Sequence, residues 1–171
     1  DGKVAVVTGC ASGVGESVAK LFTERGSKVL AVDVNADGLE CAMEGIENVA
    51  TMAQDVTDSD AAEKIIDAAL QNFGQVDILI NNAGRVIYAE VHELTDEIWN
   101  MHFDLNVGAA MRLCRRAIPE LKKRPVGRIV NIGSAVTLRS SPGLAGYTAS
   151  KHALEGLTRV LSQELVPNIT A

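Results

Sequence analysis

A tyrosine and a lysine one helical turn apart have the spacing in this sequence that most directly suggests chemistry. Tyr147 and Lys151 occupy positions i and i+4 of a predicted helix, so both side chains project from one face, about 6 Å apart along its axis. A phenol is a poor base at neutral pH, but a neighbouring ammonium group such as that of Lys151 stabilises the phenolate. Tyr147 could then exchange a proton with a substrate oxygen. The same spacing is also common on solvent-exposed helix faces, so the pair needs support from other residues.

Two polar residues precede this pair along the chain. Ser134 opens the loop after a predicted strand at residues 127–132, where it could hold a substrate oxygen by a hydrogen bond or simply be a turn residue. Asn106 lies inside a predicted helix at residues 95–118, although asparagine is a mediocre helix former. Its side chain could bind a water molecule that links Lys151 to solvent, or it could be an exposed or core-bonded amide.

A glycine-rich turn follows the first apolar run. The continuous apolar residues 4–7 are typical of a buried parallel strand, and Gly9, Gly13 and Gly15 follow directly before a helical pattern. Glycines allow backbone N–H groups to approach an anion at a helix N-terminus, so this turn predicts one wall of a dinucleotide site. Glycines also make tight turns without any ligand, and both interpretations stay open on these residues alone.

An acidic residue ends the second predicted strand, at residues 28–33. A carboxylate at this position, Asp33, can accept hydrogen bonds from both ribose hydroxyls of an adenosine and repels a 2′-phosphate. Neither Val34 nor Asn35 offers the cation that such a phosphate needs, so NAD is favoured over NADP. The alternative is a loop aspartate that caps the next turn.

Strand and helix patterns alternate along the whole chain. Further strands are predicted at 49–54, 76–80 and 127–132, and helices at 36–47, 58–73 and 95–118. Because the strands are apolar and alternate with helices, we expect an α/β, Rossmann-type doubly wound parallel sheet with helices on both faces, forming one domain over residues 1–171. The residues singled out above follow the carboxyl ends of strands, where such sheets bind ligands.

Composition excludes several classes of function. The 171 residues carry a net charge of −6, which argues against a nucleic-acid partner. Neither a signal peptide nor an apolar stretch of the roughly 20 residues that cross a bilayer is recognisable, so we expect no membrane association and a cytoplasmic location. The three cysteines and three histidines show no metal-ligand spacing, and neither a metal site nor a disulfide is predicted.

Taken together, these motifs resemble those of the short-chain dehydrogenase/reductase family. The matching residues are Thr8-Gly9-x-x-x-Gly13-x-Gly15, Asn81-Asn82-Ala83-Gly84, Asn106, Ser134 and Tyr147-x-x-x-Lys151. Each motif is weak by itself, but their joint order and spacing are specific and extend over almost the whole chain. The resemblance implies a catalytic tetrad of Asn106, Ser134, Tyr147 and Lys151, with Tyr147 as general acid/base.

The resemblance also assigns cofactor contacts. It implies that the turn around Ser12 and Val14, from Gly9 to Gly15, holds the pyrophosphate and adenosine side. It further implies Asp33 at the ribose, Asp55 and Val56 at the adenine, Asn82, Ala83 and Gly84 as neighbouring backbone, and Lys151 at the nicotinamide ribose. Val34 and Tyr147 are the other cofactor-binding residues that it implies. It further implies a homodimer or homotetramer built through the helices that carry Asn106 and Tyr147.

The resemblance leaves the function with one preferred and two alternative interpretations. Family members usually continue through further strands and a loop that covers the substrate, so we expect C-terminal strands that are missing or truncated here. The preferred function is an NAD-dependent oxidoreductase that interconverts a secondary alcohol and a ketone. The alternatives are an NADP-dependent reductase of 3-oxoacyl thioesters and a catalytically inactive NAD-binding or assembly module.

Overall fold

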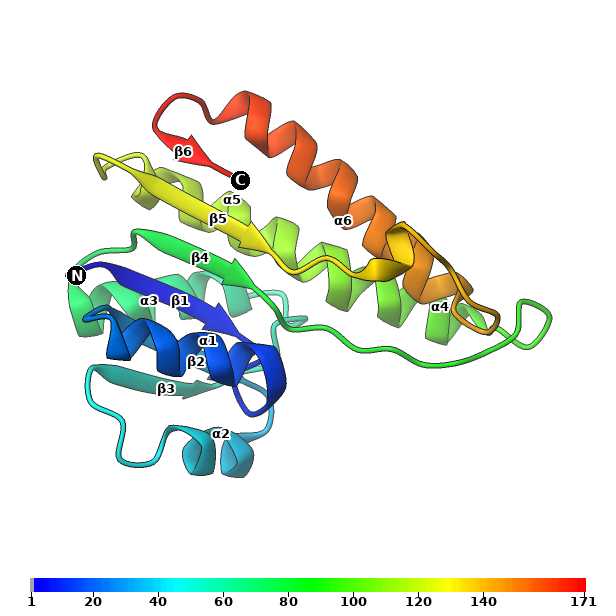
Figure 1. Ribbon diagram of the computed structural model, residues 1–171, viewed down its shortest axis with the longest axis horizontal. Helices are drawn as coiled ribbons and strands as arrows, with labels where there is room; N and C mark the ends of the chain where they lie inside the picture. Colours follow the sequence, from blue (N-terminus) through cyan, green and yellow to red (C-terminus); the bar gives the residue numbers. More distant parts are fainter. Residues whose placement is uncertain (1) are drawn as a thin grey trace.

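Six parallel strands form a single sheet in the computed structural model, which describes residues 2–171 (Figure 1). The strand order is β3-β2-β1-β4-β5-β6. The chain therefore adds β2 and β3 on one side of β1 and then crosses over to add β4, β5 and β6 on the other side of β1. The strands are β1 (Val4–Thr8), β2 (Lys28–Asp33), β3 (Val49–Ala53), β4 (Ile78–Asn81), β5 (Gly127–Asn131) and β6 (Ile169–Thr170). The predicted doubly wound parallel sheet is confirmed.

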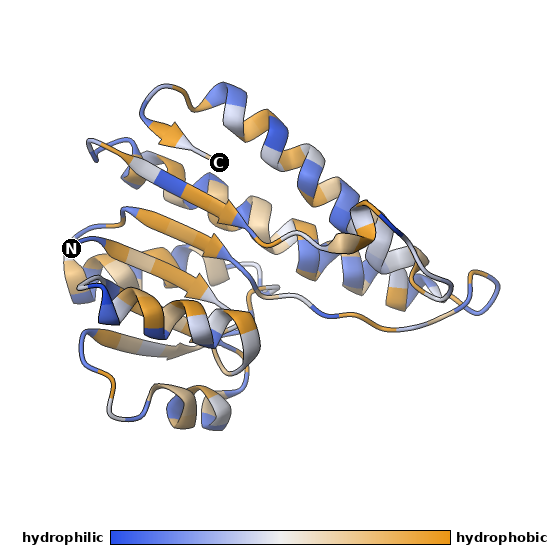
Figure 2. Ribbon diagram, in the orientation of Figure 1, coloured by the Kyte–Doolittle hydropathy of each residue, from blue (hydrophilic) through white to orange (hydrophobic). Residues whose placement is uncertain are grey.

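The apolar strands are buried because helices cover both faces of the sheet (Figure 2). Val6, Leu30 and Leu79 face a cluster built with the helices α3, α5 and α6. Val7 and Ala31, one residue along their strands, face the opposite cluster with α1 and α2. Successive strand side chains point to opposite faces, so a strand covered on both sides needs apolar residues throughout. The helices are α1 (Gly13–Glu24), α2 (Ala36–Met43), α3 (Ala61–Phe73), α4 (Asp96–Phe103), α5 (Ala109–Leu121) and α6 (Ala145–Glu164).

Several element boundaries differ from the sequence prediction. The helix predicted at 36–47 ends at Met43, and Gly45 then adopts a positive φ of 71°. The helix predicted from Asp58 begins at Ala61, because the carbonyl of Asp58 accepts the N–H of Ala61 in a preceding turn. The strand predicted at 76–80 runs over Ile78–Asn81. Those predicted to end at 54 and 132 each end one residue earlier.

The long helix predicted at 95–118 is interrupted and also continues further. Its side-chain cap is Thr95, which accepts the N–H of Ile98, but a π-helical turn, Asp104–Gly108, separates α4 from α5. Such turns are often found at functional sites, and this one contains Asn106. The helix also passes Pro119 and ends at Leu121. The fully buried Leu121 packs into the core and holds this last turn in place despite the hydrogen bond that proline cannot make.

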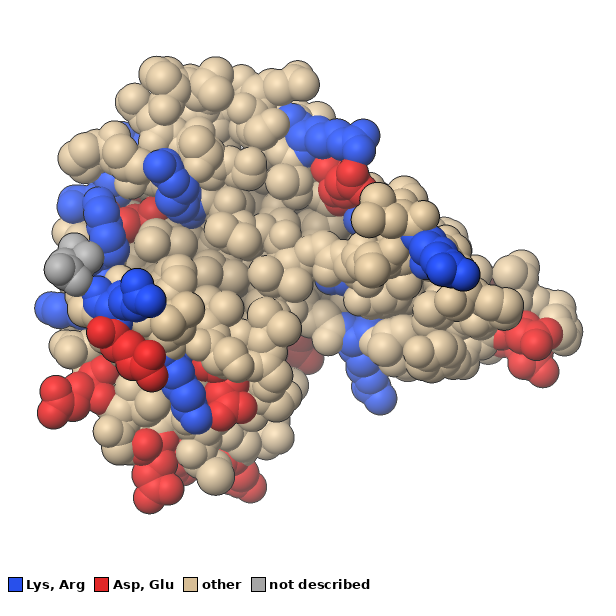
Figure 3. All heavy atoms as spheres, viewed as in Figure 1, with Lys and Arg blue, Asp and Glu red and all other residues tan. Residues whose placement is uncertain are grey.

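Charged side chains gather at the edges of the molecule. Acidic residues of α2 lie together at the lower edge of the view in Figure 3. Four of the seven basic residues from Arg112 to Arg128 form ion pairs, for example Arg116 with both Glu63 and Asp67. No helix within residues 2–171 is both long and apolar enough to cross a membrane.

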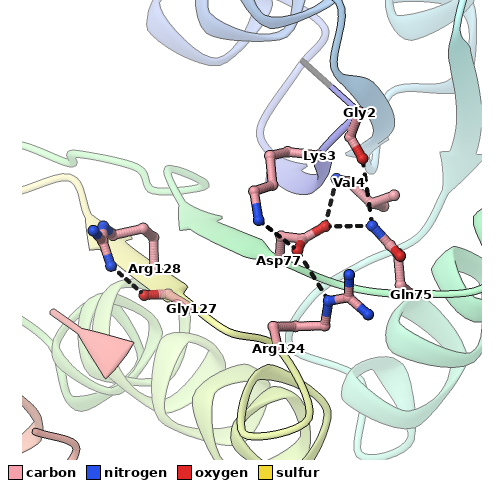
Figure 4. A network of polar contacts seen from close by, with 8 residues as sticks. All are labelled: Gly2, Lys3, Val4, Gln75, Asp77, Arg124, Gly127 and Arg128. Atoms are coloured by element: carbon pink, nitrogen blue, oxygen red, sulfur yellow. Dashed lines mark hydrogen bonds and ion pairs between the residues drawn. The ribbon is translucent and has the colours of Figure 1, made fainter. Parts of the chain in front are cut away.

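A buried carboxylate joins the amino-terminal ends of β1 and β4 to the end of α5 (Figure 4). Asp77 is fully buried, and its Oδ2 accepts the N–H of Val4 at 2.9 Å and the side-chain amide of Gln75 at 2.7 Å. Its Oδ1 accepts from Lys3 at 3.2 Å and from Arg124 at 3.0 Å. Burial by itself raises the pKa of Asp77, but these donors outweigh it, and the pKa lies below the usual value.

Replacing Asp77 with asparagine is expected to lower the free energy of unfolding by about 3 kcal/mol, because the two cations lose their buried partner. The lowered pKa of Asp77 means that its contribution to stability is present above the unfolded-state pKa near 4 and is lost as the pH falls through the folded-state pKa. Urea unfolding at neutral pH measures the effect. The control is Asp60→Asn, which removes an exposed pair with Lys64 and should cost far less stability than Asp77→Asn, because solvent screens exposed pairs. Equal losses in the two variants would contradict the assignment.

Candidate active site

The glycine-rich turn brings β1 and α1 close to the loop after β4. Gly9 has a φ of 74°, and Gly13, the first residue of α1, has a φ of 63°. Gly15 is the tightest position, since a Cβ atom there would lie 2.1 Å from the carbonyl oxygen of Gly9 and 2.5 Å from the side-chain nitrogen of Asn82. The exposed Ser12 and Val14 flank the start of α1, where N–H groups lack helical partners. The absence of side chains at Gly9 and Gly15 thus allows the start of α1 to pack directly against the turn after β1 and the loop after β4.

The loop after β4 is tied to this turn by one threonine and one asparagine. The hydroxyl oxygen of Thr8 accepts the backbone N–H groups of Asn82 and Ala83, each at 3.1 Å. In return, the side-chain amide of Asn82 donates to the carbonyl oxygens of Thr8 at 2.9 Å and Gly9 at 3.1 Å. Residues far apart in the sequence therefore form one rigid wall at the carboxyl ends of β1 and β4.

Asp33 lies at the carboxyl end of β2 and holds the glycine-rich turn. Its Oδ2 accepts the N–H of Ala11 at 2.9 Å, and its Oδ1 accepts the N–H of Asn35 at 2.9 Å. A carboxylate has about four acceptor positions, so each oxygen keeps capacity for one more donor. Asn35, rather than Asp33, caps α2 by accepting the N–H of Gly38. The bonds of Asp33 thus leave it able to accept ribose hydroxyls.

A cavity of about 370 Å³ opens between these elements. Its lining brings together seven of the predicted cofactor residues, Gly9, Asp33, Val34, Asp55, Val56, Ala83 and Gly84. It also includes Thr57, Arg85 and Met101, which the sequence patterns did not indicate. A larger hollow of about 630 Å³ lies against α2 and β3, but its lining contains none of the predicted site residues.

The side chains of Asn106 and Lys151 converge on Gly84. A Cβ atom on Gly84 would be 3.0 Å from Oδ1 of Asn106 and 3.7 Å from Nζ of Lys151. The amide of Asn106 is buried, accepting the N–H of Arg85 at 3.1 Å and donating to the hydroxyl of Ser150 at 3.0 Å. Asn106 is therefore a buried, bonded amide, and its neighbours come from the loop after β4 and from α6.

Lys151 connects α6 to the end of β5. It is 4% exposed, and its ammonium group donates to the carbonyl oxygen of Ile132 at 2.7 Å. Burial lowers the pKa of Lys151 from its ordinary value, because the charged form is disfavoured away from water. The Nζ atom lies 5.7 Å from the centre of the Tyr147 ring, which is half-buried one turn earlier on the helix. The lysine charge is therefore held beside the tyrosine ring, as the i, i+4 spacing predicts.

Ser134 lies on the loop that leaves β5. It is the N-cap of a short 3₁₀ turn, Ala135–Thr137, and its hydroxyl oxygen accepts the N–H of Val136 at 3.4 Å. Its side chain is half-buried. This turn role was one of the two interpretations that the sequence left open. The hydroxyl hydrogen is not used in that contact and remains free to donate.

Comparison with known proteins agrees with this arrangement. Residues 3–171 match the family model for short chain dehydrogenases. The chain belongs to this family. A 3-oxoacyl-(acyl-carrier-protein) reductase of Thermotoga maritima is 31% identical, covering 96% of this chain and 69% of its own. A 3beta-hydroxysteroid dehydrogenase 2 of Eggerthella lenta is 35% identical, covering 92% of this chain and 63% of its own.

The fold of this chain also matches that of a solved family structure. A crystal structure from Sinorhizobium meliloti, described as a short-chain alcohol dehydrogenase, superposes with a TM-score of 0.94 at 31% identity and covers 99% of this chain. This chain spans about two thirds of the length of these family members. Short-chain dehydrogenases are oxidoreductases that use NAD(H) or NADP(H), usually act on small molecules and are usually oligomeric.

Three polar residues that contact the site in this short-chain dehydrogenase were not predicted from the sequence. Ser150 donates to the carbonyl oxygen of Tyr147, and its own oxygen accepts from Asn106. Arg85 contributes backbone groups to Asn106, and His102 lies one turn before Asn106 on α4. For His102, the only signal in the sequence was a polar residue within the predicted helix, and its burial is known from the structure alone. Within the described residues, no group of three metal-binding side chains comes together.

Proposed function

We propose that this chain contains the dinucleotide site and the proton-transfer group of an NAD-dependent oxidoreductase, which interconverts a secondary alcohol and a ketone. The observation that carries the proposal is that Asn106 and Lys151 converge on the same side of Gly84, and that the Lys151 ammonium group lies beside the ring of Tyr147. The cavity that contains Asp33 also reaches Gly84. A cofactor held along this wall would therefore extend from the carboxylate to the tyrosine.

The residues present fit a dinucleotide. The start of α1 suits a pyrophosphate, since unpaired N–H groups at a helix N-terminus attract anions, and Gly9 and Gly15 allow this helix to begin close against the turn after β1. The spare acceptor positions of Asp33 suit the two ribose hydroxyls, and Val56 and Asp55 border the same cavity on the adenine side. We infer that NAD⁺ is preferred over NADP⁺, because the Asp33 carboxylate repels a 2′-phosphate.

Side chains of this chain carry out the proton transfer. NAD⁺, when bound, supplies the hydride acceptor. The phenolate oxygen of Tyr147 takes the hydroxyl proton of the alcohol, and in ketone reduction the phenol returns it. The ammonium group of Lys151, held by Ile132, favours the negative charge on the phenolate, and the hydroxyl of Ser134 donates a hydrogen bond to the substrate oxygen. Asn106 keeps spare acceptor capacity on Oδ1, sufficient for a water molecule that carries the proton onward.

A second candidate function is the NADP-dependent reduction of 3-oxoacyl thioesters. It is favoured by the curated relatives named 3-oxoacyl-(acyl-carrier-protein) reductase, which are 31–33% identical to this chain. A panel separates the two, with cyclohexanol, 2-butanol and 3-hydroxybutyryl-CoA assayed with NAD⁺, and acetoacetyl-CoA with NADH and NADPH. Faster reduction of acetoacetyl-CoA with NADPH than any NAD⁺ reaction would favour the second function. No turnover with tight NAD⁺ binding would support an inactive binding module.

Replacing Asp33 with asparagine is expected to weaken NAD⁺ binding by about 10–100-fold, because hydrogen bonds to a charged acceptor contribute roughly 1.5–3 kcal/mol. The same change removes the repulsion of a 2′-phosphate, so the ratio of the NADP⁺ and NAD⁺ dissociation constants should fall by more than about tenfold. Calorimetric titration with each nucleotide measures both. Asp37→Asn, an exposed change in the first turn of α2, is the matched control. Tighter binding of NADP⁺ than NAD⁺ by the unchanged protein would contradict the cofactor assignment.

We also propose that identical chains associate through the outer faces of the helices that carry Asn106 and Tyr147. Exposed apolar side chains on α4 and α5 support this, since Trp99 is 39% exposed and Met111 is 37% exposed. Trp99 stacks on Phe103 at 4.9 Å between ring centres, which gives the surface a rigid aromatic element. Light scattering of the purified protein measures the state of association, and a monomer at micromolar concentration would refute the proposal.

A further inference from the structure

A buried histidine of α4, His102, faces the first turn of α6 and has no part in the proposed chemistry. His102 has no solvent exposure, and its Nε2 accepts the backbone N–H of Ile87 at 3.1 Å. A ring nitrogen that accepts carries no hydrogen, so the neutral ring has its hydrogen on Nδ1. Burial lowers the pKa of His102 from its ordinary value, because the charged form is disfavoured away from water. The side chain is therefore a neutral imidazole at physiological pH.

The ring of His102 meets Tyr147 directly. The ring centres of His102 and Tyr147 are 6.1 Å apart with an angle of 62° between the planes, which is an edge-to-face arrangement. The neighbouring Gly146 makes room for it, since a Cβ atom at Gly146 would lie only 2.8 Å from Nδ1 of His102. The imidazole therefore occupies the space beside the first turn of α6 and limits where the phenol ring can move.

The same helix face holds the loop after β4 at two points. Asn106 binds both backbone groups of Arg85, and His102, one turn earlier, binds the N–H of Ile87. Beyond Ile87, the N–H of Ala89 donates to the carbonyl oxygen of Gly143 at 2.9 Å, just before α6. The loop thus joins α4 to the segment that leads into α6. His102 contacts this loop at Ile87 and α6 at Gly146 and Tyr147.

We propose that His102 is a positioning residue for Tyr147, a proposal that rests on the proposed function. It acts by holding the loop at Ile87 and by supporting the face of α6 at Gly146 and Tyr147. It transfers no proton itself. Because a displacement of about 1 Å at a reacting group can reduce a rate by up to about 10²-fold, a small shift of the phenol has a large effect on turnover.

The first test compares two substitutions at this position. His102→Leu fills the space with an apolar side chain and removes the acceptor. It should reduce kcat by about 10–100-fold on the best substrate of the panel without changing the dissociation constant for NAD⁺. His102→Gln supplies a carbonyl oxygen for Ile87 and should restore kcat to within a few-fold. The exposed His152→Gln on α6 is the matched control. Unchanged kcat in His102→Leu would overturn the proposal.

Gly146→Ala gives an independent perturbation. It leaves the imidazole in the chain but pushes against Nδ1, so it should lower kcat in the same way as His102→Leu. Because it changes a different residue, it keeps the proposal open to refutation even where His102→Leu folds poorly. Wild-type kcat in a folded Gly146→Ala protein would contradict the role of this contact.

A magnetic resonance experiment tests the geometry without any turnover. Amide exchange at Ile87 should be slow in the unchanged protein and in His102→Gln, and at least about tenfold faster in His102→Leu. With only two tyrosines in the chain, the contact between the Tyr147 ring and the Lys151 side chain can be followed by cross-relaxation, and it should weaken in His102→Leu alone. If the wild-type protein shows no turnover but the exchange and cross-relaxation change in His102→Leu as described, the proposed function is refuted and the structural role of His102 is supported. Unchanged exchange and cross-relaxation would refute that role itself.

Discussion

Replacing Tyr147 with phenylalanine is expected to reduce kcat by about 10²–10⁴-fold, the usual contribution of a general acid or base. The substitution removes one oxygen and keeps the ring, so the contacts with His102 and with the Lys151 ammonium group survive. Binding of NAD⁺ should change little, because we propose that the glycine-rich turn and Asp33 hold the adenosine side. Steady-state kinetics on the panel described above, together with calorimetry, separates the two effects. A loss confined to kcat and kcat/KM is the signature of a group used only in the transition state.

The matched control for this variant is the other tyrosine. Tyr88 is 72% exposed on the loop after β4, and Tyr88→Phe removes the same atom from outside the proposed site. Its kcat should stay within about twofold of the wild-type value. Equal turnover by Tyr147→Phe and the wild-type protein would disprove the assignment of the acid/base group.

Replacing Gly15 with alanine is expected to lower the free energy of unfolding by about 3 kcal/mol and to weaken NAD⁺ binding by at least about 100-fold. The added methyl group would lie 2.1 Å from the carbonyl oxygen of Gly9, so either α1 or the turn after β1 must move. Both movements displace the N–H groups proposed to hold the pyrophosphate. Urea unfolding and calorimetric titration with NAD⁺ measure the two losses.

Two other glycines calibrate this result. Gly156 lies exposed inside α6 with open space around it, so Gly156→Ala should stabilise the protein by about 0.5–1 kcal/mol. Gly13 also has open space but a φ of 63°, so Gly13→Ala should cost about 1–2 kcal/mol from backbone strain alone. Normal NAD⁺ binding by Gly15→Ala would show that the turn is not the pyrophosphate site.

The fold could be predicted because its signals are local. A strand covered on both faces needs consecutive apolar residues, and residues 4–7, 29–32 and 78–80 provide them. Helical periodicity between the strands then requires crossover connections and hence parallel pairing. Boundaries were less accurate, because they depend on hydrogen bonds such as that between Ala61 and Asp58, which propensities do not reveal.

The site was accessible from the sequence only as a set of spacings. Tyr147 and Lys151 had to lie on one helix face, and Asp33 had to end a strand, because both relations follow from backbone geometry. Their catalytic and cofactor-binding roles stay predictions. The contacts of Asn106 with Arg85 and Ser150 could not be anticipated, since the π-helical turn that orients this amide has no recognisable sequence pattern.

The amino-acid sequence alone thus determined the alternation of strands and helices, the glycine-rich turn and the order of the polar residues that identify the family. Packing between distant segments decided the rest: the closeness of Gly15 to Gly9 and Asn82, the burial of Leu121 beyond Pro119, and the place of His102 beside Tyr147. The physical reason is the distance along the chain between the residues that interact. Backbone periodicity is set by neighbours within a few residues, whereas a contact between segments depends on how the whole core fills its space.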